Sequence, residues 1–168
     1  MKQLFTYYKF SGYFLVIFIF SFIYSCTNKV SNFRNLNQEV VITPDYTGIT
    51  IPCNIAPLNF AVNEKASDYL AIYKIDGKEI FRLNSGNGIF KVPENKWKNL
   101  LKEGNGKEYT VDVCLKKPEG WVKYNTITNK ISVDSLDSHL VYRLIEPGFE
   151  TWGKMGIYQR DLSSFSEV

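Results

Sequence analysis

Short apolar and aromatic runs, separated by turn residues, dominate the chain from Val40 onward. Their length and their β-branched and aromatic content are typical of strands, and the spacing of the turns favours antiparallel pairing over βαβ units. We therefore expect an Ig-like or fibronectin-like antiparallel β-sandwich. The expected strands are 40–42, 48–52, 69–75, 78–83, 89–92, 109–115, 121–124, 125–128 and 131–133.

The clearest local prediction is a β-hairpin around Asp76-Gly77. This dipeptide favours a two-residue type I′ turn, because both central residues need a positive φ. In the expected strand 109–115, Tyr109, Val111, Val113 and Leu115 alternate with Thr110, Asp112 and Cys114. We expect the first set to face the core, because successive side chains of a strand point to opposite faces.

One helix is expected before the C-terminal region, over 93–104. Trp97, Leu100 and Leu101 follow the i, i+3, i+4 spacing of an apolar helical stripe. Pro93 stands near its start and Gly104 is placed to end it. We expect this helix to cover one end of the sheets.

The N-terminus carries the pattern of a secretory signal. Lys2 and Lys9 precede an uncharged apolar run over 13–24, which is shorter than the roughly 20 residues that span a bilayer. The sequence Ile23-Tyr24-Ser25-Cys26 resembles a bacterial lipobox, although Tyr24 is bulkier than the usual residue there. The resemblance implies cleavage before Cys26 and lipidation of its thiol, and several acyl chains such as palmitate anchor a protein stably in a bilayer. An uncleaved N-terminal anchor, or secretion with Cys26 as a free or paired thiol, are the alternatives.

These features divide the chain into four parts: a lipoprotein signal peptide (1–25), a flexible polar tether (26–38), a β-sandwich domain (39–138) and a C-terminal strand with a docking tail (139–168). The tether has no acidic residue before Glu39. Lipoproteins sent to the outer cell face tend to carry an acidic cluster there. We therefore expect a lipid-anchored protein of the cell envelope, on the outer membrane and facing the periplasm.

The tail sequence from His139 to Phe165 includes YRLIEPG at Tyr142–Gly148 and IYQRDL at Ile157–Leu162. Together with the segment 51–60 and the Trp97-containing helix, it resembles a family of Bacteroidetes envelope lipoproteins. Longer members continue into a Cys-x-x-Cys-His haem-attachment motif and a TolB-like propeller with WD40-like repeats. Neither feature occurs in these 168 residues, so neither function is expected here. The resemblance implies the N-terminal part of such a protein.

In this tail, Pro147-Gly148 follows an expected strand over 140–145, and the rest is expected to be irregular or helical. Trp152, Met155, Ile157 and Tyr158 offer an apolar docking surface. That surface either folds back on the sandwich or meets an envelope protein partner or a further C-terminal domain.

Composition changes this picture little. Ten of the 26 aromatic residues precede Ser25, and removing Lys2 and Lys9 from 20 basic residues leaves 18 against 17 acidic ones. A nearly neutral mature chain argues against a nucleic-acid partner.

Candidate catalytic chemistry is sparse. The single histidine, His139, excludes a multi-histidine zinc site within one chain, and a Ser-His-Asp triad would have to use it. Ser135, Asp137 and Ser138 are its sequence neighbours, which favours a turn or a strand edge. The glycine loops 86–88 and 104–106 lack the spacing of a phosphate cradle. We expect no enzyme activity, no cofactor and no metal.

Two function classes remain. The first is a non-enzymatic lipoprotein whose sandwich is a spacer or protein-interaction module. The second is a glycan- or ligand-binding lipoprotein that uses Trp97, Trp121 and Tyr124 as a stacking surface, unless these residues belong to the core. Cys53 and Cys114 can form one disulfide in an oxidising compartment, or remain buried thiols.

Overall fold

The computed structural model describes residues 32–144 and 156–165. All the described helices and strands belong to one compact unit, which begins at Phe33. The signal peptide, Cys26 and the tail residues Trp152 and Met155 lie outside the described residues. The fold is mainly β, with several antiparallel sheets and one described helix, which confirms the predicted class.

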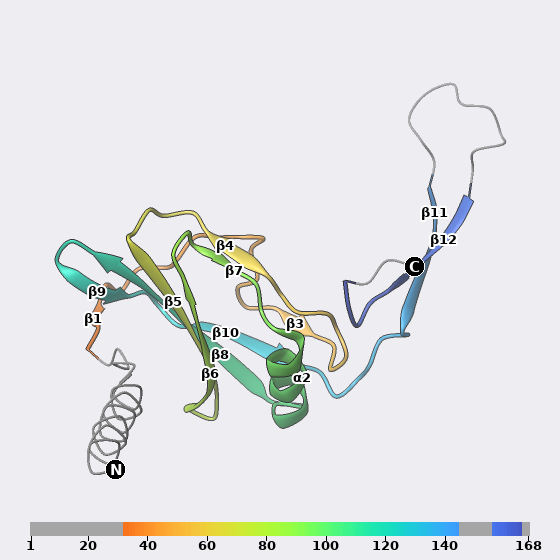
Figure 1. Ribbon diagram of the computed structural model, residues 1–168. Coiled ribbons are helices and arrows are strands. Elements are labelled where there is room, and N and C mark those ends of the chain that lie inside the picture. Colours follow the sequence, from red (N-terminus) through yellow and green to blue (C-terminus); the bar gives the residue numbers. More distant parts are fainter. Residues whose placement is uncertain (1–31, 145–155, 166–168) are drawn as a thin grey trace, which may run out of the picture. The chain divides into compact units, whose positions relative to one another are not determined.

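A seven-stranded sheet forms the larger layer (Figure 1). Its centre is β8, which pairs with β5 along one side and with β10 and then β9 along the other. β6 extends the sheet beyond β5, whereas β3 and β1 add short parallel pairings to β10 and β9. These two pairings are parallel and two residues long, whereas the other pairings in this sheet are antiparallel. The strands are β1 (Arg34–Asn35), β3 (Thr50–Ile51), β5 (Asp68–Ile75), β6 (Lys78–Ser85), β8 (Glu108–Lys117), β9 (Gly120–Lys123) and β10 (Ile127–Ile131).

A smaller sheet and the helix pack against one face of this layer. The small sheet has the order β2 (Ile42–Thr43), β4 (Phe60–Val62), β7 (Ile89–Phe90), all antiparallel. The helix α2 (Glu94–Glu103) buries Trp97, Leu100 and Leu101, as the apolar stripe predicts. Gly104 ends it with an N–H···O bond of 2.9 Å to the Leu100 carbonyl. A Cβ on Gly104 would lie 2.7 Å from the Ile131 side chain, so the residue also permits close packing.

The β5–β6 hairpin forms as predicted. Asp76 and Gly77 have φ values of 50° and 75°, the left-handed conformation that a type I′ turn requires. The register slips between Tyr73 and Lys74, so a bulge interrupts the ladder near the turn.

Successive side chains of β8 point to opposite faces of the large sheet, as predicted. Tyr109, Val111, Val113 and Leu115 join the hydrophobic core. Asp112 and Cys114 are also buried but lie outside that cluster, on the other face of the sheet. The core therefore lies between the large sheet on one side and the small sheet with α2 on the other.

Three local predictions are wrong. Residues assigned to the tether join the domain, because β1 pairs with β9 and Leu36 N–H bonds the Lys123 carbonyl at 3.0 Å. The expected strands 125–128 and 131–133 are largely replaced by one strand, β10. The tail, expected to be irregular or helical, contains β12 (Gly156–Asp161), which pairs with β11 (His139–Leu144). In each case a distant partner strand decides the conformation.

Candidate functional site

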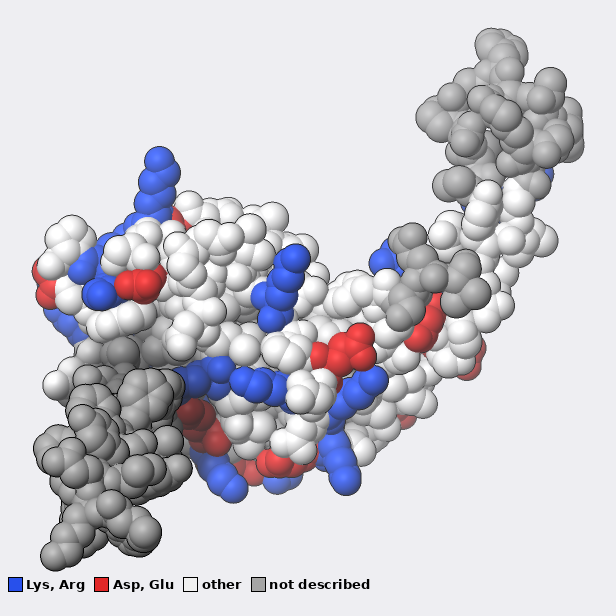
Figure 2. Space-filling view, viewed as in Figure 1, with Lys and Arg blue, Asp and Glu red and all other residues white. Residues whose placement is uncertain are grey.

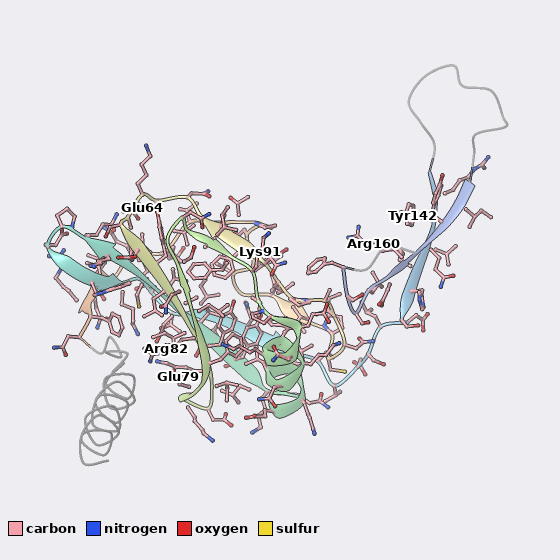
Figure 3. All side chains as sticks on the ribbon, viewed as in Figure 1. Glu64, Glu79, Arg82, Lys91, Tyr142 and Arg160 are labelled. Carbon is pink, nitrogen blue, oxygen red and sulfur yellow. The ribbon has the colours of Figure 1, made fainter. Side chains whose placement is uncertain are left out.

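The C-terminal hairpin of β11 and β12 is the most exposed apolar feature of the described chain. The two strands pair antiparallel over six positions, from His139 opposite Asp161 to Leu144 opposite Gly156. Tyr142 lies opposite Tyr158, and their rings stack with centroids 5.8 Å apart and planes at 23°. Tyr142 and the neighbouring Arg160 are both seen on this hairpin in Figure 3.

Both faces of the hairpin carry exposed apolar side chains. Val141 is 62% exposed and Ile157 is 81% exposed on one face. Leu140, Tyr142 and Tyr158 are exposed on the other. The predicted docking residues Ile157 and Tyr158 are therefore accessible and are not folded back on the core.

The base of the hairpin is tied to the domain by backbone hydrogen bonds. Leu162 accepts from Ala56 N–H at 2.8 Å, and its own N–H donates to the Ser138 carbonyl at 2.9 Å. The Asp161 carboxylate caps the following turn. It accepts hydrogen bonds from the backbone N–H of Ser163 and from the hydroxyls of Ser164 and Ser163, and these bonds lower the pKa of Asp161 to about 2. Backbone hydrogen bonds thus attach the base of the hairpin to the domain, whereas its apolar side chains are exposed to solvent.

The neighbourhood of His139 does not form a catalytic triad. The Ser138 hydroxyl and His139 Nδ1 are 2.8 Å apart, and Asp161 lies across the strand pair. A triad needs the serine on Nε2 and the carboxylate on Nδ1 of the imidazole. Here the serine occupies Nδ1 and the carboxylate bonds the serines of its own turn. Ser135, Asp137, Ser138 and His139 are all exposed, which fits the predicted strand edge.

The three aromatics predicted as a stacking surface do not form one. Trp97 is only 1% exposed, and its Nε1–H donates to the Ile55 carbonyl at 2.9 Å. Tyr124 is buried, and its hydroxyl donates to the Glu64 carboxylate; burial, and then this bond and charge, raise its pKa. Trp121 is half-buried on β9, opposite Lys116. Core packing is therefore the correct interpretation of Trp97 and Tyr124, and the exposed aromatic pair is Tyr142 with Tyr158.

Sequence reasoning missed this tyrosine pair. The sequence predicts a strand at Tyr142 and a docking surface at Tyr158, but no local signal joins the two residues, because the segment of β12 is not predicted to be a strand.

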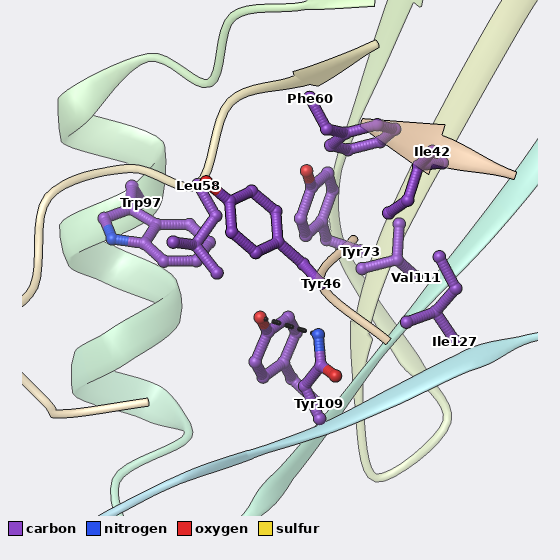
Figure 4. Close-up of a pocket in the computed structure, with 10 residues that line it drawn as sticks. Ile42, Tyr46, Leu58, Phe60, Tyr73, Trp97, Tyr109, Val111 and Ile127 are labelled. Atoms are coloured by element: carbon purple, nitrogen blue, oxygen red, sulfur yellow. Dashed lines mark hydrogen bonds between the residues drawn. The ribbon is translucent and has the colours of Figure 1, made fainter. Parts of the chain in front are cut away.

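A small cavity lies between the large sheet and the elements that cover it (Figure 4). Its volume is about 20 Å³, and its lining includes Tyr46, Phe60, Tyr73, Trp97, Tyr109 and Asn129. The Asn129 amide donates to the Tyr109 hydroxyl at 3.1 Å and accepts from Ile49 N–H at 3.1 Å. Burial, and to a lesser degree the neighbouring Tyr109, raise the pKa of Tyr73, whereas burial raises that of Tyr109 to about 12. Both phenols therefore stay protonated at neutral pH.

A polar cluster occupies the opposite face of the large sheet. Asp112, almost fully buried, accepts from Lys74 Nζ at 2.6 Å, Thr126 Oγ1 at 2.6 Å and Lys123 Nζ at 3.2 Å. Burial alone raises the pKa of Asp112, but these donors outweigh it, and the net pKa lies below its usual value. Asp112 is therefore a carboxylate with three internal donors.

The two described cysteines do not form a disulfide in the structure. Cys53 packs against the core cluster, whereas Cys114 faces the other side of the large sheet. Burial, followed by the nearby Asp112 charge, raises the pKa of the Cys114 thiol to about 12. The sheet separates the two sulfurs, which removes the disulfide prediction for this conformation.

Within residues 32–144 and 156–165, no group of three or more His, Cys, Asp or Glu side chains could hold a metal ion. No described helix is long and apolar enough to cross a membrane. Basic and acidic side chains are interspersed on the face of the molecule shown in Figure 2. No family model, curated protein or solved structure matches this chain.

Proposed function

We propose that the chain is a membrane-anchored lipoprotein of the cell envelope, acylated on Cys26, whose β-domain acts without catalysis as a protein-interaction module. The signal pattern and the lipobox-like segment ending at Cys26 support the anchor. The β11–β12 hairpin supports the interaction role, since it presents apolar side chains on both faces.

The hairpin carries this proposal because, among residues 32–144 and 156–165, its apolar side chains remain exposed. A two-stranded ribbon is marginally stable in water by itself, and needs a further surface against its apolar residues. Contiguous exposed apolar patches generally mark interaction sites. With Val141 and Ile157 on one face and Tyr142 with Tyr158 on the other, a protein partner that encloses the hairpin would cover both.

The interaction role is tested by photo-crosslinking in the cell envelope. A benzophenone amino acid replaces Ile157 in one variant and Lys78, an exposed residue of the β5–β6 turn, in a control. We expect one discrete protein adduct from position 157 and none from position 78. The adduct should disappear when Val141→Asp is added, because a charge on that face opposes burial. Equal labelling at both positions, or none at 157, contradicts the proposal.

The same variants address the glycan-binding alternative. A stacking role would use Tyr142 and Tyr158, whose rings are nearly parallel and exposed. Retention of the protein on immobilised envelope polysaccharide, lost in Tyr142→Ser and unaffected by Val141→Asp, would favour glycan binding over a protein partner.

The anchor is tested by metabolic labelling with radioactive palmitate. We expect the label to be incorporated into the wild-type protein and to be absent from Cys26→Ala. Label that persists in this variant refutes acylation at Cys26.

A further inference from the structure

The cavity between the large sheet and its covering elements is lined by tyrosine and asparagine side chains as well as by apolar ones. Tyr73 comes from the middle of β5, and Tyr46 comes from the loop between β2 and β3. In Figure 4 the Tyr73 hydroxyl points toward the rings of Phe60 and Tyr46. Thus the loop and the large sheet meet at this cavity.

Of the five lining side chains that carry a nitrogen or oxygen atom, two have no hydrogen-bond partner in the described part of the chain, and Trp97 is bonded to Ile55. Tyr109 and Asn129 bond each other, and Asn129 also accepts from Ile49 N–H. The hydroxyls of Tyr46 and Tyr73 make no such bond. Tyr73 is only 2% exposed, so nearly all of its side chain is buried.

The unpartnered Tyr73 oxygen is accessible to a water-sized molecule, and Tyr73 is one of the residues that line the cavity. Every side-chain nitrogen or oxygen of the described residues that is sealed from a water-sized molecule has a hydrogen-bond partner. Since the Tyr73 hydroxyl has none, it is an atom that such a molecule can reach. A buried hydroxyl left without a partner destabilises the fold, which favours occupation of the cavity by a hydrogen-bonding molecule.

The size of the cavity decides what that molecule is. One water molecule needs roughly 10–15 Å³ of space that the centre of a water-sized sphere can occupy, and this cavity offers about 20 Å³. We propose that the cavity is a binding site for a single ordered water molecule, held by the hydroxyls of Tyr73 and Tyr46. Each phenol can donate one hydrogen bond and accept others, so the water can satisfy both.

The bound water fastens the β2–β3 loop to the core. Tyr46 has no ring partner or hydrogen bond among the described residues, so apolar contact and the water hold its side chain in place. The loop contributes Ile49 N–H to Asn129 at the same cavity. Loss of the water should therefore loosen the cover of the core at this point.

A double-mutant cycle with Tyr73→Phe and Tyr46→Phe tests the bridge. The full-length protein in detergent is unfolded with denaturant, and near-UV circular dichroism verifies that each variant keeps its packed core. We expect each single variant to raise the unfolding equilibrium constant about fivefold, the usual effect of one lost hydrogen bond. The double variant should be no less stable than either single variant, because removal of one hydroxyl already breaks the bridge.

Tyr69→Phe is the matched control. Its hydroxyl accepts from Ala66 N–H at 2.8 Å and donates to the Glu64 carbonyl at 3.0 Å, so its removal deletes known bonds and should raise the unfolding constant. The proposal is overturned if Tyr73→Phe leaves the unfolding constant unchanged or lowers it, as expected for an unsatisfied hydroxyl in a dry cavity. Independent, additive effects of the two substitutions also overturn it.

Discussion

Replacing Asp112 with alanine tests the role of the polar cluster on the outer face of the large sheet. The Asp112 side chain is 3% exposed, whereas those of Lys74 and Lys123 are 29% and 26% exposed. Asp112→Ala removes the acceptor for both ammonium groups and for the Thr126 hydroxyl. The two lysines can turn toward solvent, which reduces the penalty of leaving them unpaired.

The magnitude follows from these contacts. A hydrogen bond to a charged group contributes about 1.5–3 kcal/mol and a neutral one about 1 kcal/mol, and part of this sum is offset by the desolvation of the carboxylate. Allowing for re-solvation of the lysines, we expect Asp112→Ala to lower the free energy of unfolding by about 2–3 kcal/mol. Urea denaturation followed by circular dichroism measures this difference.

The pH dependence gives a second measurement of the same carboxylate. The folded-state pKa of Asp112 is lowered, so its contribution is present above the unfolded value, about 3.9, and is lost as pH falls through the folded pKa. The Asp112→Asn variant should therefore have a lower free energy of unfolding than the wild type near neutral pH. This difference in unfolding free energy should shrink below about pH 4.

Glu119→Ala provides the control, because its ion pair with Arg34 joins two side chains that are more than half exposed. Such pairs contribute about 0–1 kcal/mol. If Asp112→Ala costs no more than Glu119→Ala, or if Asp112→Asn keeps the same deficit through acid pH, the buried carboxylate does not stabilise the domain as argued.

Three further substitutions or modifications have defined outcomes. Leu100→Ala, at a fully buried helical position, should lower the free energy of unfolding by about 3 kcal/mol in denaturant titrations, and a loss below about 1 kcal/mol would contradict its core role. At pH 8 the buried thiol of Cys114 should resist iodoacetamide in the folded protein while half-buried Cys53 reacts, as mass spectrometry would show; equal labelling of the two would refute this. Gly77→Ala should cost about 1 kcal/mol because φ is 75°, whereas Gly86→Ala, in open space without a positive φ, should cost less; similar thermal shifts would contradict the turn argument.

Only part of the candidate site could be predicted from the sequence. The apolar character of Ile157 and Tyr158 is visible locally, and their exposure agrees with a docking surface. The stacking of Tyr142 on Tyr158 depends on the pairing of β11 with β12, which joins residues on either side of a long connection. Likewise, nothing near Asp112 in the sequence indicates Lys74, which reaches it from the neighbouring strand.

Elements controlled by short-range rules could be predicted from the amino-acid sequence. Asp76-Gly77 specifies a turn through its backbone preference, the Trp97 stripe specifies a helix, and alternation from Tyr109 to Leu115 specifies which side chains face the core. Each rule depends on residues a few positions apart, so no knowledge of the rest of the chain is needed.

Which side chains are buried, and which segments cover the large sheet, depends on contacts between distant parts of the chain. Trp97 and Tyr124 are buried because distant segments supply Ile55 and Glu64 as polar partners, and Cys53 and Cys114 are separated because the sheet runs between them. Residues 156–161 of the tail form a strand because they pair with β11. Burial and strand pairing are properties of surfaces assembled from distant parts of the chain, and composition or periodicity within one segment does not contain them.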